Sequence, residues 1–132
     1  HQTHADLMVF PLFIWAVPNC AEELLSAKEL ELGIHAGDAE TSLMLSIMPD
    51  QVRLDQARAE FPADLPTESW LTMEGALPFA WVTRDLSTSG VLGDPTVATV
   101  DKGNQLFKSL VTGWKTVLED IYRFRQPQAQ AD

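Results

Sequence analysis

The most regular pattern of hydrophobic and polar positions lies in the last third of the chain. Apolar residues recur three or four positions apart between residues 100 and 121, which is the spacing of one face of an α-helix. The sequence Asp94-Pro95-Thr96 supplies a helix start signal just before this stripe. We therefore predict one long helix over residues 96–124, whose apolar face covers a sheet or contacts another subunit.

Near the N-terminus the pattern changes to a continuous apolar run over residues 7–15. Such a run is typical of a strand buried on both faces in a parallel sheet, although Pro11 lacks the N–H that one ladder bond needs. The spacing of leucines over residues 20–30 predicts a short amphipathic helix with Asn19 as its N-cap. We interpret the acidic residues of that helix as solvated surface.

A further apolar segment, residues 38–48, is hydrophobic nearly all round and predicts a buried helix. Asp38 stands where an N-cap is expected, and Pro49 follows where the helix must end. The buried strand and the helices that follow it indicate an α/β organisation.

The remaining segments are less regular. They comprise a charged, proline-containing linker (50–69), two short strands or extended packing segments (70–73 and 78–82), a small-residue loop long enough to cover a site (85–95), and a mobile tail (126–132). His1 and His4 are interpreted as a loose polar lead-in rather than as metal ligands.

Reactive side chains concentrate between Gly33 and Ser42. This stretch places one imidazole, His35, and two carboxylates, Asp38 and Glu40, beside two glycines at the entry of the buried helix. Because acidic residues are rarely buried without a partner, the cluster is either a functional site or a structural one in which Asp38 caps the helix and Glu40 stays near the surface. The residues alone support both readings equally.

Composition narrows the functions open to this cluster. The 132 residues suffice for one compact domain, and a net charge of −10, from 19 acidic and 9 basic residues, argues against a nucleic-acid partner. The single cysteine, Cys20, cannot form an internal disulfide and fits a cytoplasmic setting. No apolar run reaches the ~18 residues of a membrane span, so no membrane partner is expected. The first residue is His1 and not Met, which suggests that the chain begins partway through a longer gene product or was processed.

Two motifs resemble the creatininase (creatinine amidohydrolase) family. Residues 35–45 are similar to its His-Ala-Gly-Glu-x-Glu-Thr-Ser segment, and residues 90–96 are similar to its Gly-Val-Ile-Gly-Asp-Pro segment, at about the family's distance and before a long final helix. Asp38 stands where most members have Glu, which keeps the charge and shortens the reach by one methylene. The order of the two motifs makes the match fairly specific, and it covers nearly all of the chain.

The resemblance implies the C-terminal part of a creatininase-like three-layer α/β/α domain, with a mostly parallel sheet and a long C-terminal helix, over residues 1–125 and before a flexible tail. Family members are metal-dependent amidohydrolases, often hexameric, whose N-terminal half supplies most ligands of two divalent metals. We therefore expect zinc and/or manganese or iron, bound mostly by residues outside this chain. The expected partners are that N-terminal half, as a separate chain or a cleaved segment, and further copies of this chain in a homo-oligomer.

The motif match also implies roles for individual residues. His35 is similar to the catalytic histidine that assists proton transfer and polarises the scissile amide, and histidine titrates in the range that this task needs. Glu40 is similar to the carboxylate that faces the metal, either as a direct ligand or as a group that orients one. Trp15, at the end of the predicted strand, is a candidate wall of the substrate pocket, with core packing as its other role.

The function implied is part of a metal-dependent amidohydrolase that cleaves a C–N amide bond of a cyclic or formyl-bearing small molecule, active only with the N-terminal half. The family is divided among creatinine hydrolysis, deformylation of pyrimidine intermediates and cleavage of a peptide cofactor precursor, so the substrate stays open. A second hypothesis is a non-catalytic subunit or assembly module that retains the second half of the fold and uses residues 96–124 for oligomer contacts.

Overall fold

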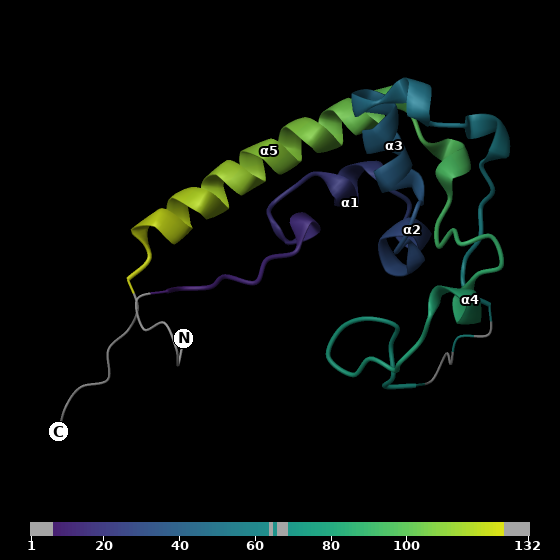
Figure 1. Ribbon diagram of the computed structural model, residues 1–132, viewed down its shortest axis with the longest axis horizontal. Helices are drawn as coiled ribbons and strands as arrows, with labels where there is room; N and C mark the ends of the chain where they lie inside the picture. The colour runs from purple at the N-terminus through teal and green to yellow at the C-terminus, as the bar shows by residue number, and fades with distance from the viewer. Residues whose placement is uncertain (1–6, 64, 66–68, 126–132) are drawn as a thin grey trace.

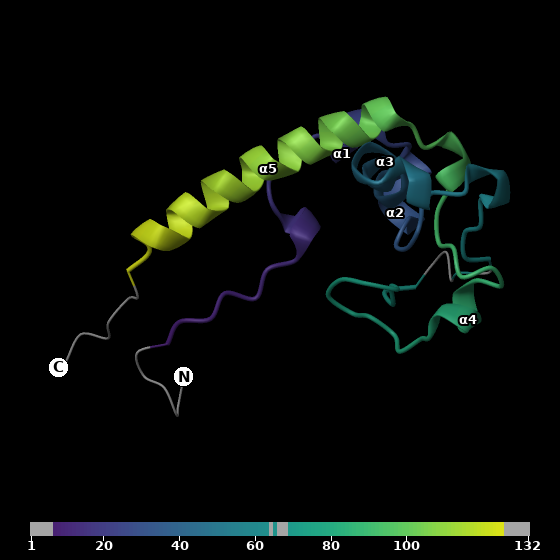
Figure 2. The same cartoon turned by 45° about the horizontal axis from the view of Figure 1, so that its top comes forward.

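The structure, a computed structural model that describes residues 7–63, 65 and 69–125, is an arch of helices joined by long loops (Figures 1 and 2). The longest helix, α5, spans the top of the arch, and α3 packs against the part of α5 nearest its start. The helices are α1 (Ala21–Leu24), α2 (Ala27–Leu32), α3 (Asp38–Ile47), α4 (Thr83–Leu86) and α5 (Val100–Arg123). Single 3-10 turns occupy η1 (Ile14–Ala16), η2 (Pro49–Gln51), η3 (Leu54–Gln56) and η4 (Pro95–Val97).

The predicted α/β fold with a mostly parallel sheet is wrong. Across the described part of the chain, strand pairing is limited to isolated bridges, which join His35 to Leu92, Glu60 to Gly93 and Thr72 to Pro78. The segments expected as short strands at 70–73 and 78–82 share only the last of these bridges.

The expected strand over residues 7–15 illustrates the reason. The described part of this run has no regular structure before η1, and its apolar side chains are exposed, with Val9 at 72%. The run lies beneath α5 and approaches the end of that helix, where the rings of Phe10 and Phe124 meet edge to face at 5.5 Å. A strand is stabilised by a neighbouring strand that pairs its N–H and C=O groups, and none of the described bridges involves this run. Apolar character alone therefore did not make it a strand.

The helix expected over residues 20–30 is divided into α1 and α2. Leu25 leaves the helix with extended backbone, and the hydroxyl of Ser26 caps α2 by accepting from the Glu29 N–H at 3.1 Å. Asn19 does help to start α1, because its Oδ1 accepts from the Ala21 N–H at 2.9 Å. The N-cap position of α1 itself belongs to Cys20.

The helices predicted over residues 38–48 and 96–124 are both present, as α3 and α5, but α5 begins later than expected. The long helix begins at Val100, with Thr99 as its N-cap, because residues 95–97 form a 3-10 turn first. The helix of the reactive stretch, α3, begins at Asp38 and ends before Pro49. Only one side of α3 is buried, and Ile47 on its other side is 53% exposed. No helix in the described ranges combines the length and the apolar character that crossing a membrane requires.

The core lies where α3 packs against α5. Gly103 permits the close approach, because a Cβ at this position would lie 1.9 Å from the Ser42 carbonyl oxygen. One turn further along the seam, the hydroxyl of Ser46 donates to Asn104 Oδ1 at 2.7 Å. The buried apolar side chains of the described residues are Val17, Leu45, Met73, Leu92, Ala98, Leu106 and Leu110.

Glu60 holds the loop that leads from α4 to the second motif. Its carboxylate accepts from the N–H and hydroxyl of Thr88, at 2.6 and 2.9 Å, and from the N–H and hydroxyl of Ser89. The Ser89 hydroxyl, followed by the two backbone N–H groups, holds the pKa of the Glu60 carboxyl well below its ordinary value of 4.5. The Glu60 backbone also exchanges both hydrogen bonds with Gly93. This one residue therefore fixes the approach to the motif.

The close α3–α5 contact predicts that Gly103→Ala destabilises the chain. The new methyl group must push the Ser42 carbonyl away, and such overpacking costs about 1–3 kcal/mol beyond the ~1 kcal/mol that alanine gains in helix propensity. Urea unfolding followed by circular dichroism measures the change. Thr112→Ala, on the exposed side of the same helix, is the control and should change stability little. A Gly103→Ala variant as stable as the unmodified chain would contradict the packing.

The Glu60 contacts predict a pH-dependent effect of Glu60→Gln. Because the folded-state pKa of Glu60 is depressed below its ordinary value of 4.5, its stabilisation is fully present above that value and is lost as the pH falls through the folded pKa. The difference in unfolding free energy between the two proteins should therefore be largest at neutral pH and shrink in strong acid. Urea titrations at a series of pH values measure it, with Asp55→Asn as the control. A constant difference across the acid range would show that the charge plays no part.

Candidate functional site

His35 lies in the turn between α2 and α3, and the second motif holds that turn in place. The His35 N–H donates to the Leu92 carbonyl oxygen at 3.1 Å, and the Leu92 N–H donates back to the His35 carbonyl at 2.8 Å. Ala36 follows in the left-handed region with φ of 53°, which non-glycine residues adopt rarely. The two sequence motifs, far apart in the chain, therefore lie side by side.

Glu40 closes the same turn from the first turn of α3. Its Oε2 accepts from the Ala36 N–H at 2.5 Å and lies 3.8 Å from His35 Nδ1. The second distance is too long for a hydrogen bond, so the imidazole and the carboxylate interact through charge when the histidine is protonated. Both side chains remain accessible, with 65% of His35 and 46% of Glu40 exposed.

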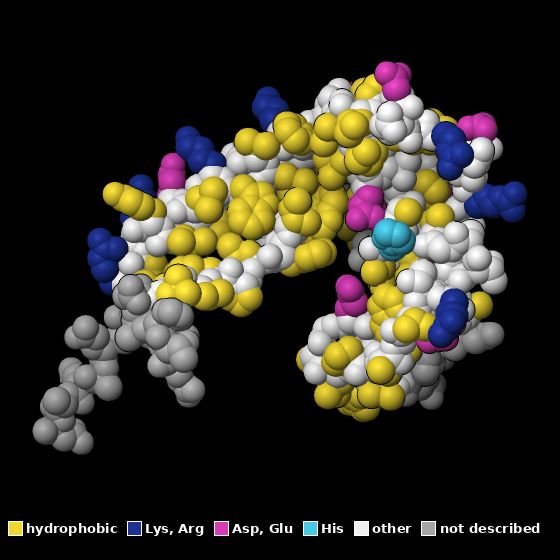
Figure 3. Space-filling model, viewed as in Figure 1, with side chains coloured by type: hydrophobic (Ala, Val, Ile, Leu, Met, Phe, Trp, Pro, Cys, Tyr) yellow, Lys and Arg dark blue, Asp and Glu magenta, His cyan; other side chains and the backbone are white. Residues whose placement is uncertain are grey.

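The three predicted site residues line one pocket of about 690 Å³. Trp15 reaches it from η1 and not from the end of a strand, whereas His35 and Glu40 reach it from the motif. Glu74, which sequence reasoning did not single out, lines the pocket from the loop between residues 69 and 79. Figure 3 shows this side of the molecule hollowed below the apolar surface of α5. The fold thus gathers the candidate residues on one concave surface.

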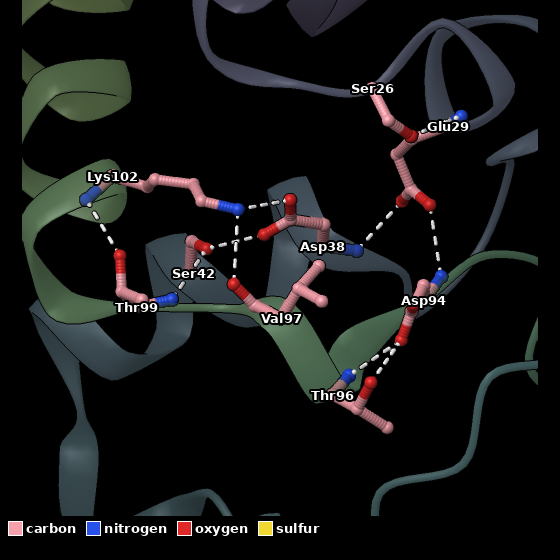
Figure 4. Close-up of polar contacts among 9 residues, drawn as sticks. All are labelled: Ser26, Glu29, Asp38, Ser42, Asp94, Thr96, Val97, Thr99 and Lys102. Carbon is pink, nitrogen blue, oxygen red and sulfur yellow. Dashed lines mark hydrogen bonds and ion pairs between the residues drawn. The ribbon is translucent and has the colours of Figure 1, made fainter.

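Asp38 plays a different part from the one predicted. Gly37 occupies the N-cap position of α3, and the Asp38 carboxylate turns to α5, where it pairs with the Lys102 ammonium group (Figure 4). The same carboxylate accepts from the Ser42 hydroxyl at 3.0 Å. With only 2% of the residue exposed, Asp38 is a buried structural ion, not a helix cap and not part of the pocket surface.

Glu29 was missed by the sequence reasoning, which took the acids of this region for solvated surface. The residue is 5% exposed, and its carboxylate accepts from the backbone N–H groups of Asp38 and Asp94 (Figure 4). One signal was available in the sequence: Ser26-Ala27-Lys28-Glu29 fits the pattern of a helix capping box, which starts a new helix at this point. That pattern places Glu29 on the first turn of α2, but it does not reveal burial.

The described residues do not make a complete metal site. Within ranges 7–63, 65 and 69–125, no three His, Cys, Asp or Glu side chains come close enough to hold an ion. A catalytic zinc ion takes three protein ligands, whereas this pocket brings His35 and Glu40 close together as a pair. These two groups therefore fit only a fragment of such a centre.

Comparison with known sequences identifies one matching family model and several related proteins. The family model described as creatininase, creatinine amidohydrolase, matches residues 1–118. The mycofactocin precursor peptide peptidase of Mycobacterium tuberculosis is 38% identical over 77 residues, which cover 58% of this chain and 28% of the relative. The protein of the same name from Mycolicibacterium smegmatis is 35% identical over 79 residues, 60% of this chain and 30% of the relative. The matched region thus spans less than a third of these relatives.

Solved structures give the same kind of partial match. A putative creatinine amidohydrolase from Bacteroides fragilis shares the fold with a TM-score of 0.60 at 23% identity, over 82% of this chain and 41% of the other. A manganese creatininase matches with a TM-score of 0.50 at 27% identity, over 67% of this chain and 31% of that one. A zinc–zinc creatininase gives the same values.

The family model spans most of the chain, and the structure brings the two motifs of that family together at one pocket. The chain therefore belongs to the creatininase family of amidohydrolases.

Proposed function

We propose that this chain forms part of a metal-dependent amidohydrolase that hydrolyses a C–N amide bond in a cyclic or formyl-bearing small molecule. The observation that carries the proposal is that His35 and Glu40, the two motif residues with accessible reactive groups, face one pocket. Membership of the family supplies the reaction class, and the manganese and zinc–zinc creatininases supply the metal by analogy.

His35 is proposed to deliver the proton that the departing nitrogen needs. Its side chain is exposed to the pocket, and Nδ1 is the ring nitrogen near the Glu40 carboxylate. With a proton on Nδ1, Nε2 is left to take the proton that the attacking water gives up and to pass it to the departing nitrogen, which leaves as an amine. Proton transfer by a positioned side chain contributes typically 10²–10⁴-fold to a rate, and this is the contribution assigned to His35.

Glu40 is proposed to serve the metal centre with one oxygen and the turn with the other. Oε2 accepts from the Ala36 N–H, whereas Oε1 makes no hydrogen bond with any described residue. A carboxylate oxygen oriented in this way suits a divalent cation. Because the described residues offer too few ligands, most of the metal's ligands are proposed to come from outside this chain, on the N-terminal half of the domain.

The pocket supports a small substrate. Its volume of about 690 Å³ lies within the 300–1,000 Å³ usual for small-molecule sites. Trp15 is proposed as its apolar wall, because it lines the pocket together with the apolar residues Phe13 and Val17. The curated relatives are named for a peptide substrate, so peptide amides belong in the substrate panel beside creatinine and formamides.

The proposal predicts that His35→Ala lowers kcat for amide hydrolysis by about 10²–10⁴-fold while bound metal is retained. The chain is co-expressed with the unmatched portion of a related creatininase, and hydrolysis and metal content are measured on the purified complex. Lys108→Ala, an exposed change on α5, is the control for expression and folding. About one bound zinc or manganese ion per site, together with loss of activity in His35→Ala but not in Lys108→Ala, would support the proposed hydrolase function. Full activity in His35→Ala would refute its role.

A second proposal, from a different class, is a non-catalytic assembly module in which another copy of the chain covers α5. The observation that favours it is the exposed apolar side of that helix, which forms a groove of about 880 Å³. Val111 and Leu118 in this groove are 54% and 55% exposed, and Figure 3 shows apolar side chains gathered along the helix. We name this surface, formed by Phe107, Val111, Trp114, Leu118 and Tyr122, the α5 face.

The total exposed area supports a large contact. The chain exposes 10190 Å², whereas a compact monomer of its mass exposes about 6,900 Å². The excess of roughly 3,000 Å² per chain is more than the about 1,000–2,500 Å² that each partner contributes to an obligate interface. The assembly module, in homo-oligomers up to the hexamer, is therefore proposed to form through the α5 face.

The assembly proposal predicts that paired Val111→Glu and Leu118→Glu changes weaken self-association by roughly thirtyfold or more, because an unpaired charge in an apolar interface costs at least ~2 kcal/mol. Analytical ultracentrifugation of the chain alone measures the association constant. Thr112→Glu with Thr116→Glu adds the same charge to exposed positions of the same helix and is the matched control. A chain that sediments as a monomer before any change would rule out this proposal and leave the hydrolase reading standing.

A further inference from the structure

One carboxylate outside the predicted site residues holds both sides of the His35 turn. We infer that Glu29 is a positioning residue: its carboxylate ties the start of α3 to the Gly93–Asp94 loop and thereby fixes the turn that presents His35 to the pocket. The inference rests on the role proposed above for His35. It adds a residue that acts through the backbone and carries no step of the reaction itself.

The Glu29 carboxylate binds two backbone N–H groups that are remote in sequence. Oε1 accepts from the Asp38 N–H at 2.7 Å, and Oε2 accepts from the Asp94 N–H at 2.9 Å (Figure 4). Hydrogen bonds to an ionised acceptor are roughly twice as strong as neutral ones. The Asp38 N–H is also one of the donors that the start of a helix leaves without an intrahelical partner. Glu29 thus caps α3 from a different helix.

Tight packing keeps this carboxylate in place. A Cβ added at Gly37 would lie 2.0 Å from Glu29 Oε1, and one added at Gly93 would lie 2.8 Å from the same oxygen. The Gly93 position would also bring that Cβ within 2.6 Å of the Gly37 Cα. The two loops therefore meet backbone to backbone over the carboxylate, at a distance that only glycine allows, and Glu29 has little room to move.

Glu29 is connected to His35 through hydrogen bonds and two short backbone segments, which together form a closed ring. Asp38 lies three residues after His35, and Asp94 lies two residues after Leu92. His35 and Leu92 exchange both backbone hydrogen bonds. Glu29 joins the far ends of the same two segments, at Asp38 and Asp94. The backbone of the turn is therefore fixed both at His35 and three residues later, at Asp38.

The chemistry of the site requires a carboxylate and not merely a polar side chain. Glutamine has the shape of glutamate but only one acceptor oxygen. Its NH₂ group would therefore face one of the two backbone N–H groups, and two donors cannot form a hydrogen bond. A buried N–H group without an acceptor destabilises the folded protein. Aspartate retains both acceptors on a shorter arm, and is therefore expected to restore part of what glutamine loses.

The test compares Glu29→Gln and Glu29→Asp with Glu31→Gln, an exposed carboxylate on the same helix. By NMR of the full chain, the amides of Asp38 and Asp94 should exchange slowly in the unmodified protein. In Glu29→Gln at least one of the two should exchange about tenfold faster, because glutamine can accept a hydrogen bond from only one of them. The imidazole Cε1–H signal of His35 should broaden or split in Glu29→Gln, stay single in Glu31→Gln, and partly recover in Glu29→Asp.

The assembled hydrolase provides a second readout. Glu29→Gln should lower kcat by about ten- to a hundredfold, because small displacements of a catalytic group have effects of that size. KM should change less, because Glu29 lines the pocket but only 5% of the residue is exposed. A purely structural role would instead lower the amount of folded enzyme and leave kcat per folded molecule unchanged.

Three outcomes would overturn the inference. Asp38 and Asp94 amides that exchange at unprotected rates in the unmodified chain would show that Glu29 does not clamp them, with no variant required to fold. A single, unshifted His35 signal in Glu29→Gln would show that the clamp does not position the imidazole, and an unchanged kcat would show the same for the reaction. The NMR results stand even if His35→Ala leaves hydrolysis intact, so failure of the proposed function is seen separately.

Discussion

The burial of two carboxylates, Glu29 and Asp38, is the constraint on which the rest of the structure depends. A charge removed from water is costly unless an opposite charge or hydrogen-bond donors surround it. Asp38 meets the Lys102 ammonium group and the Ser42 hydroxyl, and Glu29 meets two backbone N–H groups. Because these partners come from separate segments, α2, α3, α5 and the loop before η4 satisfy the two charges only when they pack together in this one arrangement.

This polar network also divides the acidic residues of the motif between two tasks. Asp38 and Glu40 lie two positions apart on the first turn of α3 and so point to different sides of the helix. Asp38 faces α5 and is buried, whereas Glu40 faces the pocket with 46% of its side chain exposed. The shorter arm of Asp38 suits a residue packed directly against Lys102. The same helical turn thus anchors the fold on one side and presents reactive groups on the other.

The sequence predicted the parts of this structure that depend on short-range pattern. The apolar stripe that ends near residue 121 predicted α5, and the apolar pattern of residues 38–48 with the stop at Pro49 predicted α3. Likewise, His35, Glu40 and Trp15 were predicted as site residues, and the fold places them on one pocket. Their catalytic roles remain proposals. What failed depends on partners in space: residues 7–15 read as a strand, but a strand exists only through pairing. Glu29 read as surface, because nothing in its neighbours along the chain shows that Gly37 and Gly93 close over it.

The proposed function gives one physical explanation for two features: the exposed apolar area, and the incomplete set of metal ligands among the residues that the structure describes. Most of the buried core lies at the α3–α5 seam and in the segments beside it, so much of the apolar surface that the composition provides stays in contact with water, including the α5 face. The pocket that holds His35 and Glu40 opens on the same concave side of the arch. A polypeptide that covered this side would bury apolar surface and could bring ligands to Glu40 in a single binding event. Binding energy from the apolar contact would then fix the metal centre against His35, which is how remote contacts support chemistry at a reacting centre.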